Sequence, residues 1–144
     1  MYVNRPGLLV ALGVLIIISL LLYAVVRKRD QLSEAELRRV PLHSEKCGAL
    51  FGLTFSVSHP FARVTVYPDL LVVASCGWRS EMAVSEIREL ELLQKFWPGV
   101  RVKPTSVYED EVIVWTLQAD RLMHTIETAR RDFKPGEMDH LQAP

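Results

Sequence analysis

The segment VYPDLLVVASCGWRSEMAVSEI, residues 66–87, decides the fold class, because it consists of extended runs separated by short turns. Pro68-Asp69 is a turn dipeptide, and the apolar run Leu70 to Ala74 after it is typical of a central strand. Cys76-Gly77 interrupts this run, and Trp78 to Val84 then alternates between apolar and polar residues. The segment therefore predicts an antiparallel sheet, and no pattern in it indicates catalysis.

Further strands are predicted on both sides of this segment. Leu50 to Val57 and Ala62 to Tyr67 alternate with a period of two residues, and His59-Pro60 between them indicates a turn. Pro98-Gly99 predicts another turn, and Glu111 to Leu117 is expected to be the last strand. The stretch Ile87 to Phe96 is ambiguous, since its residues favour a helix whereas its position between strands favours a strand.

A helix is expected after the last strand. Asp120 is a candidate cap, and Pro135-Gly136 would terminate the helix. Its apolar residues form one stripe at helical spacing: Leu122, Ile126, Ala129 and Phe133. The strands and this helix can bury one modest core.

The N-terminal segment Leu8 to Val26 has 19 residues without a charge, 14 of them Leu, Ile or Val. A helix of this length spans about 28 Å, close to the thickness of a bilayer's hydrocarbon core. A cleaved signal peptide is the rival interpretation, but its apolar region is shorter and ends at small residues. Here the run stops at three membrane-surface cations, Arg27, Lys28 and Arg29, which favours a retained anchor.

The distribution of charge predicts the orientation of this anchor. Residues 1–39 carry a net charge of +3 and the remainder −3, although the whole chain is formally neutral. Because the flank richer in cations faces the cytoplasm, we expect the N-terminus outside and the C-terminal domain in the cytoplasm. The mildly acidic domain argues against nucleic acid as a partner.

Residues 30–39, DQLSEAELRR, predict a short polar helix between the anchor and the sheet. Ser33 and Glu36 have the spacing of a capping box, and Pro41 would end the helix. The interpretation is a stalk that keeps the domain close to the bilayer.

The order of these segments resembles the PH-like/GRAM superfamily, and is closest to small bacterial membrane proteins with a PH-like domain. The matching segments are Tyr67–Val73, Val84–Ile87, Val112–Leu117 and Leu122–Phe133. The resemblance implies an α+β protein in which an N-terminal transmembrane helix precedes a PH-like split β-barrel capped by a C-terminal helix. It also implies that Ile87 to Phe96 is a strand.

The domain organisation follows from the anchor, the stalk and this resemblance. It comprises a short N-terminal tail (residues 1–7), a transmembrane helix (8–26), a basic helical stalk (27–42), a PH-like domain (43–134) and a flexible tail (135–144). The expected location is the bacterial plasma (inner) membrane. Phosphoinositide-binding members of the superfamily carry several cations in the first hairpin loop, whereas this chain has only Arg63 there, so that site is not carried over.

One group of residues is a candidate binding site. The hairpin KFWPGVRVK places two aromatic residues at a turn among three cations: Lys95, Phe96, Trp97, Arg101 and Lys103. Such a group suits a membrane interface or a protein partner. The alternative is that Trp97 folds back over the core and the cations face solvent.

The sequence predicts no catalytic residue, no metal ligand and no cofactor. The four histidines lack ligand spacing, and no phosphate loop or nucleophile motif is present. Cys47 and Cys76 are expected to be free thiols, with a disulfide as the alternative. The predicted function is a membrane-anchored, non-catalytic interaction module that tethers or scaffolds a protein partner. The alternatives are a peripheral anionic-lipid sensor and an accessory subunit of a larger membrane complex.

Overall fold

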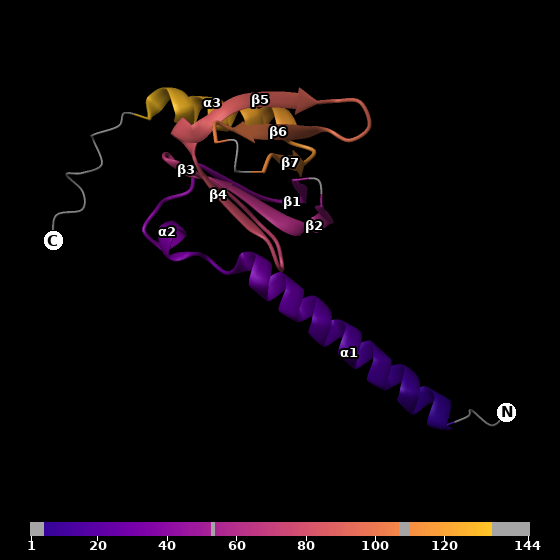
Figure 1. Cartoon of the computed structure of the whole chain (residues 1–144). Coiled ribbons are helices and arrows are strands. Elements are labelled where there is room, and N and C mark those ends of the chain that lie inside the picture. The colour runs from indigo at the N-terminus through magenta and orange to yellow at the C-terminus, as the bar shows by residue number, and fades with distance from the viewer. Residues whose placement is uncertain (1–4, 53, 107–109, 134–144) are drawn as a thin grey trace.

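The computed structural model describes residues 5–52, 54–106 and 110–133, so the predicted flexible tail lies outside the described residues. The described residues form three α-helices and one 3₁₀ turn: α1 (Arg5–Asp30), α2 (Glu34–Leu37), η1 (Val84–Glu86) and α3 (Ala119–Asp132). Seven strands complete the fold: β1 (His43–Phe51), β2 (Phe55–Val66), β3 (Leu70–Ala74), β4 (Arg79–Ala83), β5 (Ile87–Leu93), β6 (Gly99–Pro104) and β7 (Val112–Trp115). The protein is thus α+β, with an apolar helix, a curled sheet and a C-terminal helix (Figure 1).

The helix α1 is longer than the apolar segment that predicts it. It continues past Val26 through the three cations to Asp30, and it projects from the sheet as a separate rod (Figure 1). Its large apolar side chains from Val10 to Tyr23 are exposed; Leu15, for example, is 61% accessible. The span Val10–Asp30 is long and apolar enough to cross a membrane, a property that membrane anchors share with signal sequences.

The seven strands form one antiparallel sheet in the order β4-β3-β2-β1-β7-β6-β5. Two meanders, β1 to β4 and β5 to β7, are joined because β7 pairs with β1. The sheet curls into a half-barrel, and α3 packs into its concave side against β5, β6 and β2. This curl separates a concave face, which holds the core, from a convex outer face.

The core confirms the predicted helical stripe. Leu122, Ile126 and Ala129 are buried among the inward-facing residues of the strands, and Phe133 packs at the helix end. The expectation that Asp120 caps the helix is wrong, because α3 begins at Ala119 and its N-cap residue is Gln118. Asp120 lies in the first turn, where its negative charge still suits the helix dipole.

The predicted single strand Leu50 to Val57 is wrong, because the chain reverses within it. β1 ends at Phe51 and β2 begins at Phe55. Gly52 between them has φ of +58°, a backbone conformation that glycine adopts without steric cost. The alternation of apolar residues continues through the hairpin, so the pattern did not reveal the turn.

The predicted turn at His59-Pro60 is also wrong, since both residues lie inside β2. The partner of Cys47 is Ala62, whereas the partner of Ala49 is Val57. Residues 58–61 therefore bulge out of the ladder opposite Gly48. This bulge, named here the β2 bulge, later forms one wall of the candidate site.

The ambiguous stretch Ile87 to Phe96 contains a strand, as the resemblance implies. β5 occupies Ile87–Leu93, and Leu90 and Leu92 pack on the core. Glu89 and Glu91 lie on the other face of the sheet, where their register partners in β6 are Lys103 and Arg101. Burial of alternate residues thus outweighs the helix-favouring composition.

Candidate functional site

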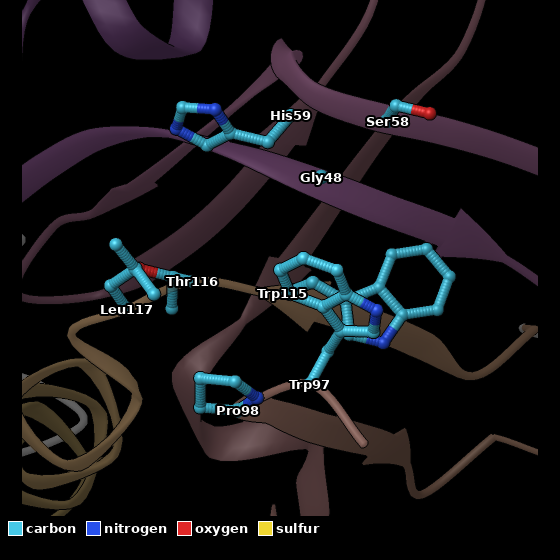
Figure 2. A pocket seen from close by; sticks show the side chains of 8 residues that line it. All are labelled: Gly48, Ser58, His59, Trp97, Pro98, Trp115, Thr116 and Leu117. Atoms are coloured by element: carbon cyan, nitrogen blue, oxygen red, sulfur yellow. The ribbon is translucent and has the colours of Figure 1, made fainter.

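A pocket of about 560 Å³ opens on the outer face of the sheet, where β1, β2 and β7 meet the β5–β6 loop. Figure 2 shows the β2 bulge on one side of it, with Pro98 and two indoles on the other. Its lining is largely apolar and aromatic: Gly48, Ser58, His59, Trp97, Pro98, Trp115, Thr116 and Leu117. Ligand-binding pockets of proteins commonly have such a volume and such an apolar lining.

The floor of the pocket is Trp115, whose neighbours on both adjacent strands are glycines. Gly48 of β1 and Gly99 of β6 are its register partners. A Cβ on Gly48 would lie 3.3 Å from the Trp115 ring, and one on Gly99 would lie 3.1 Å from it. The indole therefore covers both glycines, an arrangement known to compensate for the missing side chains.

The wall opposite the β2 bulge comes from loops that the sheet holds in place. The Thr116 N–H donates to the carbonyl of Pro98 at 3.0 Å, which joins the end of β7 to the β5–β6 loop. Trp97 and Leu117 remain 70% and 87% exposed at the rim. These side chains offer apolar surface, while His59, Ser58 and Thr116 supply the polar groups.

The β2 bulge also contacts the end of α1. Arg29 is 2% exposed, and its Nη1 donates to the carbonyl of Pro60 at 2.6 Å. Its other nitrogens bond the carboxylate of Asp30. Because His59 lines the pocket and Pro60 follows it, the pocket lies next to the C-terminal end of α1.

The segment predicted as a stalk is docked on the domain. Glu36 of α2 is 1% exposed and contacts Arg63 of β2 and Arg79 of β4. Its carboxylate accepts from Arg63 Nη2 at 2.8 Å, from the Tyr67 hydroxyl at 3.1 Å, and also from Arg79. A further ion pair, Arg39 with Asp69 at 2.6 Å, secures the end of α2. We name this set the α2 latch.

The electrostatics of the α2 latch favour an ionised Glu36. Burial alone would raise the pKa of Glu36, but the Ser33 N–H, the Arg63 charge, and the hydrogen bonds from Arg79 and Tyr67 together lower it. The predicted capping box is half-formed. The Ser33 N–H donates to Glu36 at 3.0 Å, whereas the Ser33 hydroxyl has no partner in the described part of the chain.

The predicted binding residues are only partly brought together. Phe96 and Trp97 are exposed at the tip of the β5–β6 loop, beside the exposed Lys95. Arg101 instead bonds Glu91 at 2.7 Å, and Lys103 bonds Glu89 at 3.1 Å, across the β5–β6 pair. Two of the three cations are thus neutralised by acids of the neighbouring strand.

The sequence did not point to Trp115, Leu117 or His59 as site residues. Their proximity depends on the β2 bulge and on the pairing of β7 with β1, which links residues far apart in the chain. The two glycines beside Trp115 would indicate the site only once the pairing of β7 with β1 and β6 is known.

The cysteines are free thiols. Cys47 is fully buried, and burial raises the pKa of its thiol to about 12. Cys76 is half-buried at a second hollow, beside the end of α1. Within residues 5–52, 54–106 and 110–133, no three His, Cys, Asp or Glu residues are arranged to hold a metal ion.

Comparisons with known proteins identify the fold alone. No protein-family model matches the chain, and no curated protein matches it. Among solved structures, the C-terminal domain of an unknown protein from Leishmania infantum is similar, with a TM-score of 0.53 and 15% identity. The match covers 65% of this chain and 85% of that one. It supports a small curled β-domain, and the PH-like/GRAM family is not shown.

Proposed function

We propose that the chain is a single-pass membrane protein whose domain is a non-catalytic interaction module at the cytoplasmic surface. The exposed apolar side chains of α1 are unfavourable in water, and a lipid bilayer would bury them. Arg27 and Lys28 are exposed directly after the apolar run, as expected of cations at the cytoplasmic surface.

A PH-like architecture is part of this proposal. Two antiparallel meanders with a helix packed in the curl agree with the split barrel that the resemblance implies. Domains of this kind carry unrelated binding functions, so the residues of the site, and not the fold, determine the function.

The observation that carries the proposal is the aromatic pocket beside the end of α1. Trp97, Trp115 and Leu117 present apolar surface around a few polar groups, as in the central regions of protein interfaces. Anchoring raises the local concentration of the domain near membrane partners, so that a small contact suffices for binding. We therefore propose a protein partner that inserts an apolar or aromatic side chain into the pocket.

Photo-crosslinking of the full chain in cell membranes tests the partner. A benzophenone amino acid at Leu117 lies at the rim of the pocket, and one at His124, exposed on α3, is the matched control. We expect a discrete protein adduct at position 117 that disappears with Trp97→Ala and is absent at position 124. Equal adducts at both positions would reject the pocket as the binding site.

The anchor and its orientation need a separate measurement. We expect the mass of the mature protein to include residues 8–26, and we expect Cys76 to resist an impermeant maleimide in intact cells but to react after lysis. A mature chain that begins after residue 26 would show that α1 is a signal sequence.

A further inference from the structure

We propose that the β5–β6 loop, residues 94–98, is a second membrane contact, which inserts Phe96 into the interface of the bilayer that α1 spans. This inference rests on the proposed anchor function. It assigns a role to an aromatic residue that the pocket does not use, since Phe96 is absent from the pocket lining.

The β5–β6 loop exposes two aromatic rings to solvent. Phe96 is 93% exposed and Trp97 is 70% exposed, although both have large apolar rings. Adjacent exposed aromatic rings at a loop tip are unfavourable in water and are enriched where proteins meet the membrane interface. Lys95 beside them can keep its ammonium group at the headgroups while its methylenes contact the apolar layer.

The β5–β6 loop is connected to the end of α1 through the pocket. Trp97 and His59 line the same pocket, and Pro60 next to His59 accepts the hydrogen bond from Arg29. Arg29 lies three residues after Val26, the last residue of the apolar run, which is about 4.5 Å along a helix. The loop is therefore held near the level at which α1 leaves the hydrocarbon core. In Figure 1 the β5–β6 loop and α1 both extend to the right of the sheet, whereas α2 lies at the left.

The α2 latch holds the domain in this orientation relative to α1. The bonds from Arg63, Arg79 and Tyr67 to Glu36 hold the segment after α1 against the sheet. Arg29 holds the end of α1 itself against Pro60. Little orientational entropy is then lost when the loop meets the bilayer, because the domain is already positioned.

The charges of β6 indicate how the contact is made. Arg101 and Lys103 are paired with Glu91 and Glu89, so they have little free charge to offer anionic headgroups. The contact is consequently apolar insertion, and it should depend little on lipid charge. This distinguishes it from an anionic-lipid sensor.

The test uses the full chain reconstituted in vesicles of phosphatidylcholine, with and without phosphatidylglycerol. A benzophenone amino acid replaces Phe96, Leu37 or Leu15 in three separate proteins, and lipid adducts are measured by mass spectrometry. Leu37 is the matched control, because it is an apolar residue 68% exposed on α2. Leu15 reports on α1 itself. We expect lipid adducts at positions 15 and 96 in both vesicle types, and only background at position 37.

The outcomes separate the inference from the function on which it rests. Adducts at 15 but not at 96 would overturn the second contact and leave the anchor standing. Absence of adducts at 15 would remove the anchor and the second contact together. Adducts at 96 only with phosphatidylglycerol, or equal adducts at 37 and 96, would also overturn apolar insertion by this loop.

A second measurement examines the role of the α2 latch. Glu36→Gln and, separately, Arg39→Gln loosen the latch at its centre and at its end. We expect either variant, with its strand content verified by circular dichroism, to reduce the adduct at 96 several-fold and to leave that at 15 unchanged. Unchanged adducts at 96 in both variants would show that the latch does not position the loop.

Discussion

The carboxylate of Glu36 and the guanidinium of Arg63 meet at 2.8 Å, although 27 residues separate them in the chain. The Glu36 side chain is fully buried, and that of Arg63 is 11% exposed. Burial of an ion pair is tolerated only where further hydrogen bonds satisfy the charges, and Tyr67, Arg79 and the Ser33 N–H supply them here. A segment that was expected to be a simple spacer is thereby part of the folded domain.

The first prediction concerns removal of this charge. Glu36→Gln leaves two guanidinium groups without their carboxylate, so we expect the free energy of unfolding to fall by about 3 kcal/mol. The matched control is Glu91→Gln, whose pair with Arg101 is largely solvated and whose loss should cost less than about 1 kcal/mol. Urea unfolding of the full chain in detergent micelles measures both, and equal losses would contradict the prediction.

The second prediction is that the stability difference between wild type and Glu36→Gln depends on pH. The pKa of Glu36 is lowered from its ordinary value of 4.5 in the folded protein, so its stabilising effect is complete above that value. It is lost as the pH falls from about 4.5 through the lower folded pKa, because the carboxylate then takes up a proton. We expect the difference between wild type and Glu36→Gln to be constant near neutral pH and to shrink below 4.5 in a series of urea titrations. A difference that grows in acid would refute this assignment.

The third prediction concerns the glycines beside Trp115. A Cβ on Gly99 would lie 2.6 Å from the carbonyl of Val114, and one on Gly48 would lie 3.0 Å from that of Val57. Since backbone atoms cannot move aside, Gly99→Ala should destabilise by about 1–3 kcal/mol and Gly48→Ala by less. Gly77, which has no atom within 4 Å of an added Cβ, is the control, and Gly77→Ala should change stability by less than about 0.5 kcal/mol. Thermal unfolding of the three variants should reproduce this order.

The fourth prediction concerns thiol reactivity. Cys47 is buried and the pKa of its thiol is raised to about 12, so little thiolate forms and no reagent reaches it. We expect maleimide to add one label to the folded protein, at Cys76, and two after unfolding. Intact mass measurement counts the labels, and Cys76→Ser should leave the folded protein unlabelled. Labelling of Cys47 in that variant without unfolding would show that the core around it opens.

Local patterns predicted most of the fold. The turn at Pro68-Asp69, the strands beside it and the stripe of Leu122, Ile126 and Ala129 are confirmed, because each depends on neighbouring residues alone. The reversal at Gly52 was missed, since the alternation of apolar residues continues through the hairpin. The sequence also did not reveal the β2 bulge, which depends on how many residues of β2 face each residue of β1.

The candidate site was predicted less well than the fold. Trp97 and Phe96 were recognised from their place at a turn, and both are exposed there. Arg101 and Lys103 were grouped with them by proximity in sequence, but side chains that alternate along β6 face Glu91 and Glu89 of β5 instead. Trp115 lies in the site because β7 pairs with β1, and no local sequence pattern predicts pairing between strands so far apart in the chain.

The β2 bulge connects the pocket to the C-terminal end of α1. His59 faces the pocket, while the next residue, Pro60, holds Arg29 through its carbonyl. Only the backbone of Pro60, whose ring restricts φ, separates the Cα of His59 from the carbonyl that accepts from Arg29. A group that displaced His59 on entering the pocket would therefore also shift the hydrogen-bond acceptor of Arg29, at the last turn of α1.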